Sequence, residues 1–201
     1  MNSLPSGGYK ENEMGRFSIT VHVKTEADGA GIREMMSKRG FAECSAEDAE
    51  RTYYLALGGN GWATLASDRY RDGMSGYEDA EKLAAALKTA AVVAEVADSD
   101  FATLKLYLPD GSMDVLWVGD PSGYGIDNPP KPKRSRWETL IPDDEAWERF
   151  IGIAEKDNVF VEDTLYELAP VLGIKPEYIC ADHRDFTENE DCKATVMYFK
   201  K

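Results

Sequence analysis

The sequence holds few residues of the kinds that build metal centres and disulfide frameworks. Its 201 residues include three cysteines and two histidines. Cys44, Cys180 and Cys192 form no CxxC pair, and their odd number and irregular spacing argue against a disulfide framework. We therefore expect a protein of the reducing cytoplasm.

Common signatures of enzymes are also missing. The chain contains neither the GxSxG elbow of hydrolases nor the HExxH motif of zinc peptidases. Among its 37 acidic residues, no pair stands out as a catalytic acid and base. We identify no catalytic residue and predict no cofactor, so the sequence leans towards a protein without enzymatic activity.

Long apolar runs and net positive charge are absent as well. No run approaches the roughly 18 apolar residues of a membrane-spanning helix, and residues 1–15 lack the layout of a signal peptide. The 23 basic and 37 acidic residues give a formal net charge of -14, which repels phosphate backbones and anionic membranes. We expect no nucleic-acid or membrane partner. An acidic surface suits solubility or a basic protein partner.

What the sequence does contain is enough apolar material for one core, at 43% hydrophobic residues. Residues 1–15 are polar and glycine-rich, which predicts a flexible arm. Residues 16–201 are expected to form a single domain. Within it, residues 119–136 are rich in glycine, proline and basic residues and predict a long loop.

Hydrophobic periodicity predicts an α+β protein. An alternating pattern predicts a half-buried strand over residues 16–25, and apolar residues at helical spacing predict helices over residues 29–40 and 76–90. Up to residue 97 the predicted order is strand, helix, strand, strand, helix, strand, which is the ferredoxin-like βαββαβ arrangement. We expect a further hairpin, C-terminal helices and a last strand to extend this core.

Glycines crowd the segment LALGGNGWATLAS, residues 55–67, which raises the question of a phosphate-binding loop. Such a loop continues as GK[ST] or GxGxxG into a helix. Here Gly61 is followed by Trp62 and a strand-like run, and Asn60-Gly61 suits a tight turn. The segment therefore predicts a β-hairpin.

A second hairpin is predicted at Asp110-Gly111. A two-residue turn there would place Leu106 and Val115 on one buried face, together with Leu104 and Trp117, and would place Asp114 opposite Tyr107.

Four residues are candidate binding residues: Asp98, Asp100, Asp114 and Trp62. The two aspartates of Asp98-Ser99-Asp100, joined by Asp114 from the next hairpin arm, offer oxygen ligands for Mg²⁺ or Ca²⁺. The segment Asp98-Ser99-Asp100 also suits a plain turn, because Asp and Ser side chains form hydrogen bonds with their own backbone. The sequence favours the turn and leaves the metal site as an alternative.

Three other groups are weaker candidates. Cys180, Asp182, His183 and Cys192 are metal-ligand types at a spacing unusual for zinc. The basic cluster of Lys131, Lys133, Arg134 and Arg136 suits a phosphate or the acidic surface of a second copy of the chain, but the sequence favours a solvated loop. Of the tryptophans, Trp117 and Trp147 are expected in the core, and Trp62 and Trp137 are expected to be partly exposed.

A set of short motifs runs through residues 61–119 and 160–174: a GW strand, a helix rich in Leu and Ala, DSD between two strands, an aspartate after a hairpin, and a late helix ending in LGI. In these motifs the chain resembles a group of uncharacterised bacterial α+β proteins, over about half its length. The resemblance implies a soluble bacterial protein and supplies no catalytic residue.

Two hypotheses of function follow. The first is a non-enzymatic module that binds a basic protein, for example an immunity-type protein that neutralises a basic toxin. The alternative is a divalent-metal-binding protein or enzyme that uses Asp98, Asp100 and Asp114. Convergence of the three carboxylates would distinguish the two.

Overall fold

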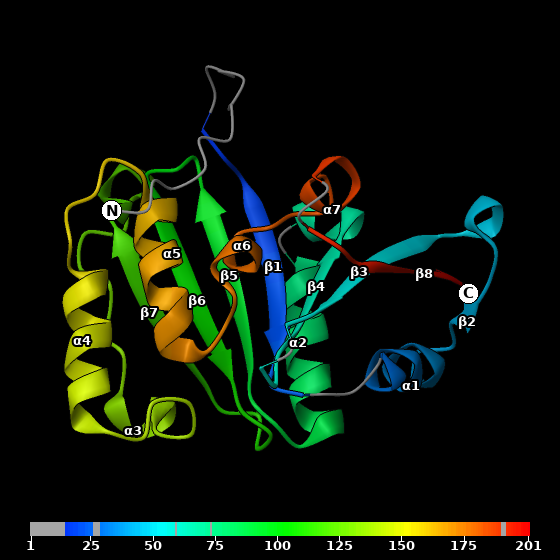
Figure 1. Cartoon of the computed structure of the whole chain (residues 1–201), viewed down its shortest axis with the longest axis horizontal. Coiled ribbons are helices and arrows are strands. Elements are labelled where there is room, and N and C mark those ends of the chain that lie inside the picture. The colour runs from blue at the N-terminus through cyan, green and yellow to red at the C-terminus, as the bar shows by residue number, and fades with distance from the viewer. Residues whose placement is uncertain (1–14, 26–28, 59, 73, 190–191) are drawn as a thin grey trace.

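One antiparallel sheet organises the fold (Figure 1). The computed structural model describes residues 15–25, 29–58, 60–72, 74–189 and 192–201, so most of the expected N-terminal arm lies outside the described residues. The sheet has eight strands in the order β2-β8-β3-β4-β1-β5-β6-β7. Their bounds are β1 Ser18–Val23, β2 Ala42–Glu43, β3 Arg51–Leu57, β4 Ala63–Ser67, β5 Ala91–Ala97, β6 Phe101–Tyr107, β7 Met113–Gly119 and β8 Thr195–Lys200.

Helices lie on both faces of this sheet. In Figure 1, α4, α5 and α6 are on the near face and α2 is on the far face, and α1 packs with α2 in the same core. The α-helices in the described residues are α1 Ala30–Lys38, α2 Met74–Leu87, α3 Arg134–Trp137, α4 Asp144–Ala154, α5 Val161–Leu172, α6 Pro176–Ile179 and α7 Asp185–Glu188. Short 3-10 helices are η1 Ala46–Asp48, η2 Asp68–Asp72 and η3 Pro121–Tyr124.

The mixed α+β class agrees with the prediction, but the sheet is larger than a βαββαβ core. β6 and β7 extend it on one side, and β8 and β2 extend it on the other. The predicted last strand is β8, which pairs with β3. The two-residue strand β2 was not predicted, because a segment of this length carries no periodicity.

The two largest apolar cores lie on opposite faces of the sheet and towards opposite ends of it. On the near face the core contains residues of β5, β6 and β7 packed against α4 and α5. On the far face it contains residues of β8, β3, β4, β1 and β5 packed against α1 and α2, with Tyr107 of β6 at its edge and no residue of β7. The far face of β7 and the near face of β8 are therefore left without a helix from these two cores.

The prediction of a half-buried β1 is wrong. Val21 and Val23 face the far-side core as expected, but Thr20 and His22 on the opposite face are also fully buried. The segment after α6 covers them: Thr20 Oγ1 donates to the carbonyl oxygen of Ala181 at 2.7 Å. β1 lies between β4 and β5, so it is a central strand buried on both faces.

The glycine-rich segment between β3 and β4 is a hairpin turn, as predicted. The two strands pair antiparallel up to Leu57 and Ala63, and the Gly58 amide donates to the Trp62 carbonyl at 2.9 Å. Gly61 has a φ of 80°, which few residues other than glycine and asparagine tolerate. No helix follows the turn, so the phosphate-loop interpretation does not apply.

The β6–β7 hairpin exists, but its predicted register is wrong by one residue. Lys105 pairs with Val115 and Leu106 pairs with Asp114, so Leu106 and Val115 lie on opposite faces of the sheet. The connection has three residues, 109–111, and Gly111 at its end has a φ of 81°. A left-handed residue after a turn is typical of three-residue hairpin loops. Leu104 and Leu106 are buried on the near face, whereas Val115 and Trp117 are half-buried on the far face.

The predicted loop over residues 119–136 is more ordered than expected. It contains η3, and α3 begins at Arg134. Asp114 accepts a hydrogen bond from the Lys133 amide at 2.6 Å, which fixes the end of the loop to β7. The expected C-terminal helices are present and include α4 and α5.

Candidate functional site

Asp98, Ser99 and Asp100 form the turn between β5 and β6. Asp98 and Ser99 have φ values of 53° and 57°, and the Asp100 amide donates to the Ala97 carbonyl at 3.2 Å. Two consecutive positive φ values are typical of the tight turns of hairpins, and Asp tolerates them better than most residues. The turn interpretation is confirmed.

Ser99 at the tip of this turn joins three parts of the chain. Its Oγ accepts from the Arg16 amide at 2.9 Å and donates to Glu162 Oε1 at 2.6 Å, and its carbonyl accepts from the Val161 amide at 3.3 Å. The turn therefore anchors the start of β1 and the start of α5. Asp98 and Asp100 form no salt bridge with a described residue.

Asp114 is not near the other two aspartates. It pairs with Leu106, five residues along β6 from Phe101, the residue that follows Asp100. Five residues of a strand span about 16 Å. Its Oδ2 accepts from the Lys133 amide at 2.6 Å and from Trp137 Nε1 at 2.8 Å, so it holds α3 against β7.

The three carboxylates therefore do not converge into one cation site. Across the described ranges, no group of three or more His, Cys, Asp or Glu side chains is arranged to hold a metal ion.

Trp62 is part of the core and not an exposed binding residue. It is 3% exposed, and its indole Nε1 donates to the carbonyl oxygen of Leu172 at 3.0 Å. Asn60 Nδ2 donates to the neighbouring carbonyl of Gly173. The β3–β4 turn therefore holds the end of α5, and the expectation of a partly exposed Trp62 is wrong.

The other tryptophans also differ from expectation. Trp137 is fully buried although partial exposure was expected, and Trp117 and Trp147, expected in the core, are half-buried. For Trp117 the cause is the register of the β6–β7 hairpin, which turns this residue towards the face without a helix.

The cysteines and histidines do not gather into a site. Cys180 and Cys192 lie in different apolar clusters, and burial raises the pKa of the Cys180 thiol, which makes it a poor nucleophile. Asp182 is paired with Arg184 at 2.5 Å. His22 Nδ1 contacts Thr64 Oγ1 at 3.0 Å and Nε2 contacts the Ile179 carbonyl at 3.3 Å.

The basic cluster after residue 130 is largely paired within the chain. Arg134 donates to the carbonyls of Ile141 and Pro142 at 2.7 and 3.1 Å, and it pairs with Asp144 at 3.2 Å. Lys131 lies 3.9 Å from Glu155. These contacts support a structural role for the cluster in placing α3 and α4.

Sequence reasoning missed a buried charged network around Asp79 of α2. Asp79 is fully buried and accepts from Arg39 Nη1 at 2.5 Å, from the Tyr53 hydroxyl at 2.7 Å and from the Tyr70 hydroxyl at 3.3 Å. Burial raises the pKa of Asp79, and the donors oppose this shift. The signal in the sequence is an aspartate inside the apolar stripe of a helix. Arg39 also lies 3.7 Å from the half-exposed Glu78, but Asp79, Tyr53 and Tyr70 are buried, so we assign the network to stability.

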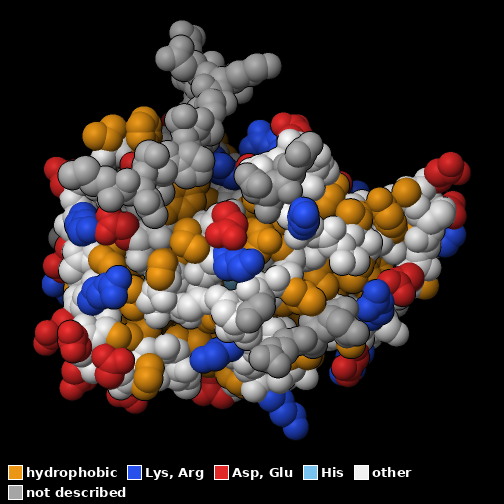
Figure 2. Space-filling view, viewed as in Figure 1, with side chains coloured by type: hydrophobic (Ala, Val, Ile, Leu, Met, Phe, Trp, Pro, Cys, Tyr) orange, Lys and Arg blue, Asp and Glu red, His pale blue; other side chains and the backbone are white. Residues whose placement is uncertain are grey.

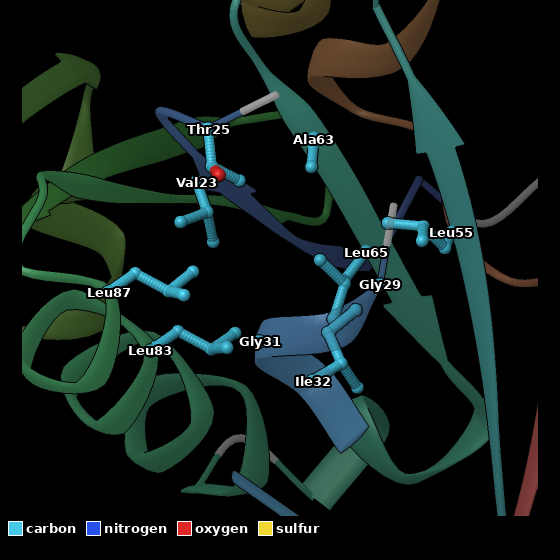
Figure 3. A pocket seen from close by; sticks show the side chains of 10 residues that line it. All are labelled: Val23, Thr25, Gly29, Gly31, Ile32, Leu55, Ala63, Leu65, Leu83 and Leu87. Atoms are coloured by element: carbon cyan, nitrogen blue, oxygen red, sulfur yellow. The ribbon is translucent and has the colours of Figure 1, made fainter. Parts of the chain in front are cut away.

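A small hollow lies between α1, α2 and the sheet (Figure 3). Its lining is aliphatic, with Ile32, Leu55, Leu83 and Leu87 directed towards one another. Its volume is about 10 Å³, which is space for about one water molecule at most. It is a gap in the packing and not a ligand site.

A partly open apolar surface lies on the far face of the last two strands. Tyr107, Met113, Val115 and Trp117 share this face, and we call them the β6–β7 open face. Met113 is 51% exposed and the other three are half-buried. The nearest helix is α2, whose Tyr77 ring lies 3.7 Å from Lys105 Nζ. Lys105 is neutralised by Glu95 at 2.8 Å.

Carboxylates border this open face at both ends. The pKa of Tyr107 is raised to about 12 by burial, with contributions from the charges of Glu81 and Glu95. The pKa of Tyr124 in η3 is raised by desolvation and then by the charges of Asp98 and Asp100. Two of the four sequence candidates, Asp98 and Asp100, thus lie at the border of an aromatic surface that the sequence did not indicate.

The near face also carries apolar side chains beyond its helices. Figure 2 shows hydrophobic side chains over β3 and β8, where Val196 is 38% exposed and Tyr54 stacks on Phe186 of α7. Here α7 covers part of the strands.

Searches for similar proteins add no assignment. No protein family, curated protein or solved structure matches the chain. In the described part of the chain, no helix has the length and apolar character needed to cross a membrane.

Proposed function

We propose that the protein is a non-enzymatic module that binds a basic protein partner through the β6–β7 open face. The observation that carries this proposal is the apolar far face of β7, which packs against neither α1 nor α2, lies beside Tyr107 at the edge of their core, and is bordered by carboxylates. Large exposed apolar patches with a polar border often mark protein interaction sites. Aromatic residues such as Tyr107 and Trp117 are typical anchors of protein interfaces.

Charge decides the kind of partner. The formal net charge is -14, and Glu81, Asp98 and Asp100 form no salt bridge with described residues. A basic partner would be attracted over a distance and would neutralise these groups on contact. An immunity-type protein that neutralises a basic toxin is a specific form of this proposal. The same charge argues against a nucleic-acid partner.

The test uses a short synthetic peptide of alternating arginine and leucine, with a glutamate–leucine peptide as the charge control. Binding is measured by calorimetry at physiological ionic strength. Val115→Lys should weaken binding of the basic peptide about tenfold, because it puts a positive charge on the apolar face. Val196→Lys is the matched control, since it makes the same change on a strand at the other end of the sheet.

Two results would contradict the proposal. One is equal binding of the basic peptide by wild type and Val115→Lys. The other is equal binding of the two peptides by the wild type, which would show that charge does not select the partner.

For the fold, we propose that β1, α1, β3, β4, α2 and β5 form a ferredoxin-like unit within the larger sheet. The neighbour order β3-β4-β1-β5, with antiparallel pairing throughout, supports this assignment. We also keep as proposals the cytoplasmic location, which three cysteines outside any disulfide support, and the resemblance to uncharacterised bacterial proteins.

A further inference from the structure

Three aromatic rings from different elements meet at one end of the β6–β7 open face. The rings of Phe101 and Trp117 stack with centroids 6.0 Å apart, and Tyr124 of η3 meets Phe101 edge-on at 4.8 Å. Phe101 is 8% exposed and supports the other two, whereas Tyr124 is 47% exposed. The cluster therefore has a buried base, an exposed Tyr124 and a half-buried Trp117.

Two carboxylates adjoin this aromatic cluster. Asp98 and Asp100 belong to the turn that leads directly into Phe101, and their negative charges act on the Tyr124 hydroxyl. Glu95, further along the same face, is neutralised by Lys105. Asp98 and Asp100 have no such partner among the described residues.

Resting on the proposed function, we propose that Tyr124, Trp117, Asp98 and Asp100 bind an arginine side chain of the basic partner. A planar guanidinium stacks on aromatic rings and presents paired N–H donors to carboxylates, which a lysine ammonium does less well. The side chain would lie against Tyr124 and Trp117 with its donors directed to the aspartates. This site would be the anchor point of the interface.

The test uses capped arginine, N-acetyl-arginine amide, and its neutral counterpart N-acetyl-citrulline amide. Each is titrated into the protein, and the indole N–H signal of Trp117 is followed by NMR. Capped arginine should shift this signal saturably and the citrulline compound should not. Capped lysine should bind more weakly than capped arginine.

Variants separate the contributions of ring and charge. Tyr124→Leu should weaken arginine binding about two- to fivefold, the usual effect of an exposed cation–π contact, and Tyr124→Phe should retain it. Asp98→Asn together with Asp100→Asn should weaken binding by a similar factor. Asp127→Asn, an exposed aspartate three residues beyond Tyr124, removes one charge of the same loop and should have no effect.

The outcomes distinguish this inference from the function on which it rests. Equal binding of arginine and citrulline, or unchanged binding in Tyr124→Leu, overturns the arginine site. If the basic peptide still requires Val115 in that case, the open face remains the binding surface. If capped arginine binds as expected but Val115→Lys leaves the affinity for the basic peptide unchanged, the arginine site is supported and the wider docking surface is refuted.

Discussion

The indole N–H of Trp62 donates a hydrogen bond of 3.0 Å to the carbonyl oxygen of Leu172, the last residue of α5. The last carbonyl groups of a helix have no partner within the helix, and this one is buried. Gly173 follows in the left-handed conformation, with a φ of 79°. Trp62 thus satisfies the end of α5 and joins it to the β3–β4 hairpin.

Trp62→Phe should therefore destabilise the protein by about 2 kcal/mol, because it leaves a buried carbonyl without a donor and removes part of a buried ring. The measurement is the free energy of unfolding in urea. Trp147→Phe is the control, since Trp147 is half-buried, and it should cost less than about 1 kcal/mol. Equal costs for the two variants would contradict the role assigned to Trp62.

The Asp79 network predicts a graded series of stability losses. Tyr53→Phe should cost about 1.5 kcal/mol, and Tyr70→Phe should cost less, because the Tyr53 hydroxyl is 2.7 Å from Asp79 and the Tyr70 hydroxyl is 3.3 Å away. Asp79→Ala should cost about 3 kcal/mol, since it also leaves Arg39 without its partner. Thermal or urea unfolding checks the order, and a larger loss in Tyr70→Phe than in Tyr53→Phe would refute it.

Stability should fall on acidification partly because of His22. Burial lowers its pKa from 6.5 to about 4, so the folded state keeps His22 neutral while the unfolded state takes up a proton. The contribution to stability is complete above pH 6.5 and is lost as the pH falls towards 4. From about pH 7 to about pH 5, the wild type should lose about 2 kcal/mol more than His22→Gln.

The control for His22 is the second histidine of the chain. His183→Gln should retain the wild-type pH dependence, because His183 lies outside the buried face of β1. Urea unfolding at both pH values measures the difference. A wild type and a His22→Gln variant with parallel pH profiles would show that His22 is not kept neutral by the fold.

Asp98→Asn should change the free energy of unfolding by no more than about 0.5 kcal/mol, because Asn also tolerates a positive φ. Asp98→Val should cost about 1 kcal/mol or more, since a β-branched residue is strained at a φ of 53°. Neither Mg²⁺ nor Ca²⁺ should raise the melting temperature of the wild type. A rise that Asp98→Asn abolishes would restore the metal alternative, because only a bound native state gains stability in this way.

Local patterns predicted the elements whose signal is local. The alternation in β1 and the apolar stripes of α4 and α5 are each contained in one short segment, so hydrophobic periodicity reveals these elements. The burial of the second face of β1 has no such local signal, because Ala181, which covers Thr20, lies 161 positions from it. No short window of sequence contains both, and Thr20 and His22 therefore looked like the solvent face of a half-buried strand.

The sequence predicted only the part of the candidate site that has a local signal. Asp98 and Asp100 carry the local signature of a turn, and the turn is present. Their neighbour Tyr124 comes from a loop in which nothing indicates the contact with Phe101. The outward position of Trp117 depends on whether the hairpin loop has two or three residues, and Pro109-Asp110-Gly111 suits both lengths.

Because β1 is buried on both faces, it reaches its final environment only after the residues that cover it have been synthesised. β1 is synthesised before the residues that cover its polar face, Ile179 to Asp185, because Ala181 follows Thr20 by 161 positions. Until then Thr20 and His22 face solvent, and β3 lacks its neighbour β8. In a nascent chain halted before residue 176, the polar face of β1 would thus be accessible in the middle of the sheet. Chaperones and proteases could bind there until residues 179–185 cover it.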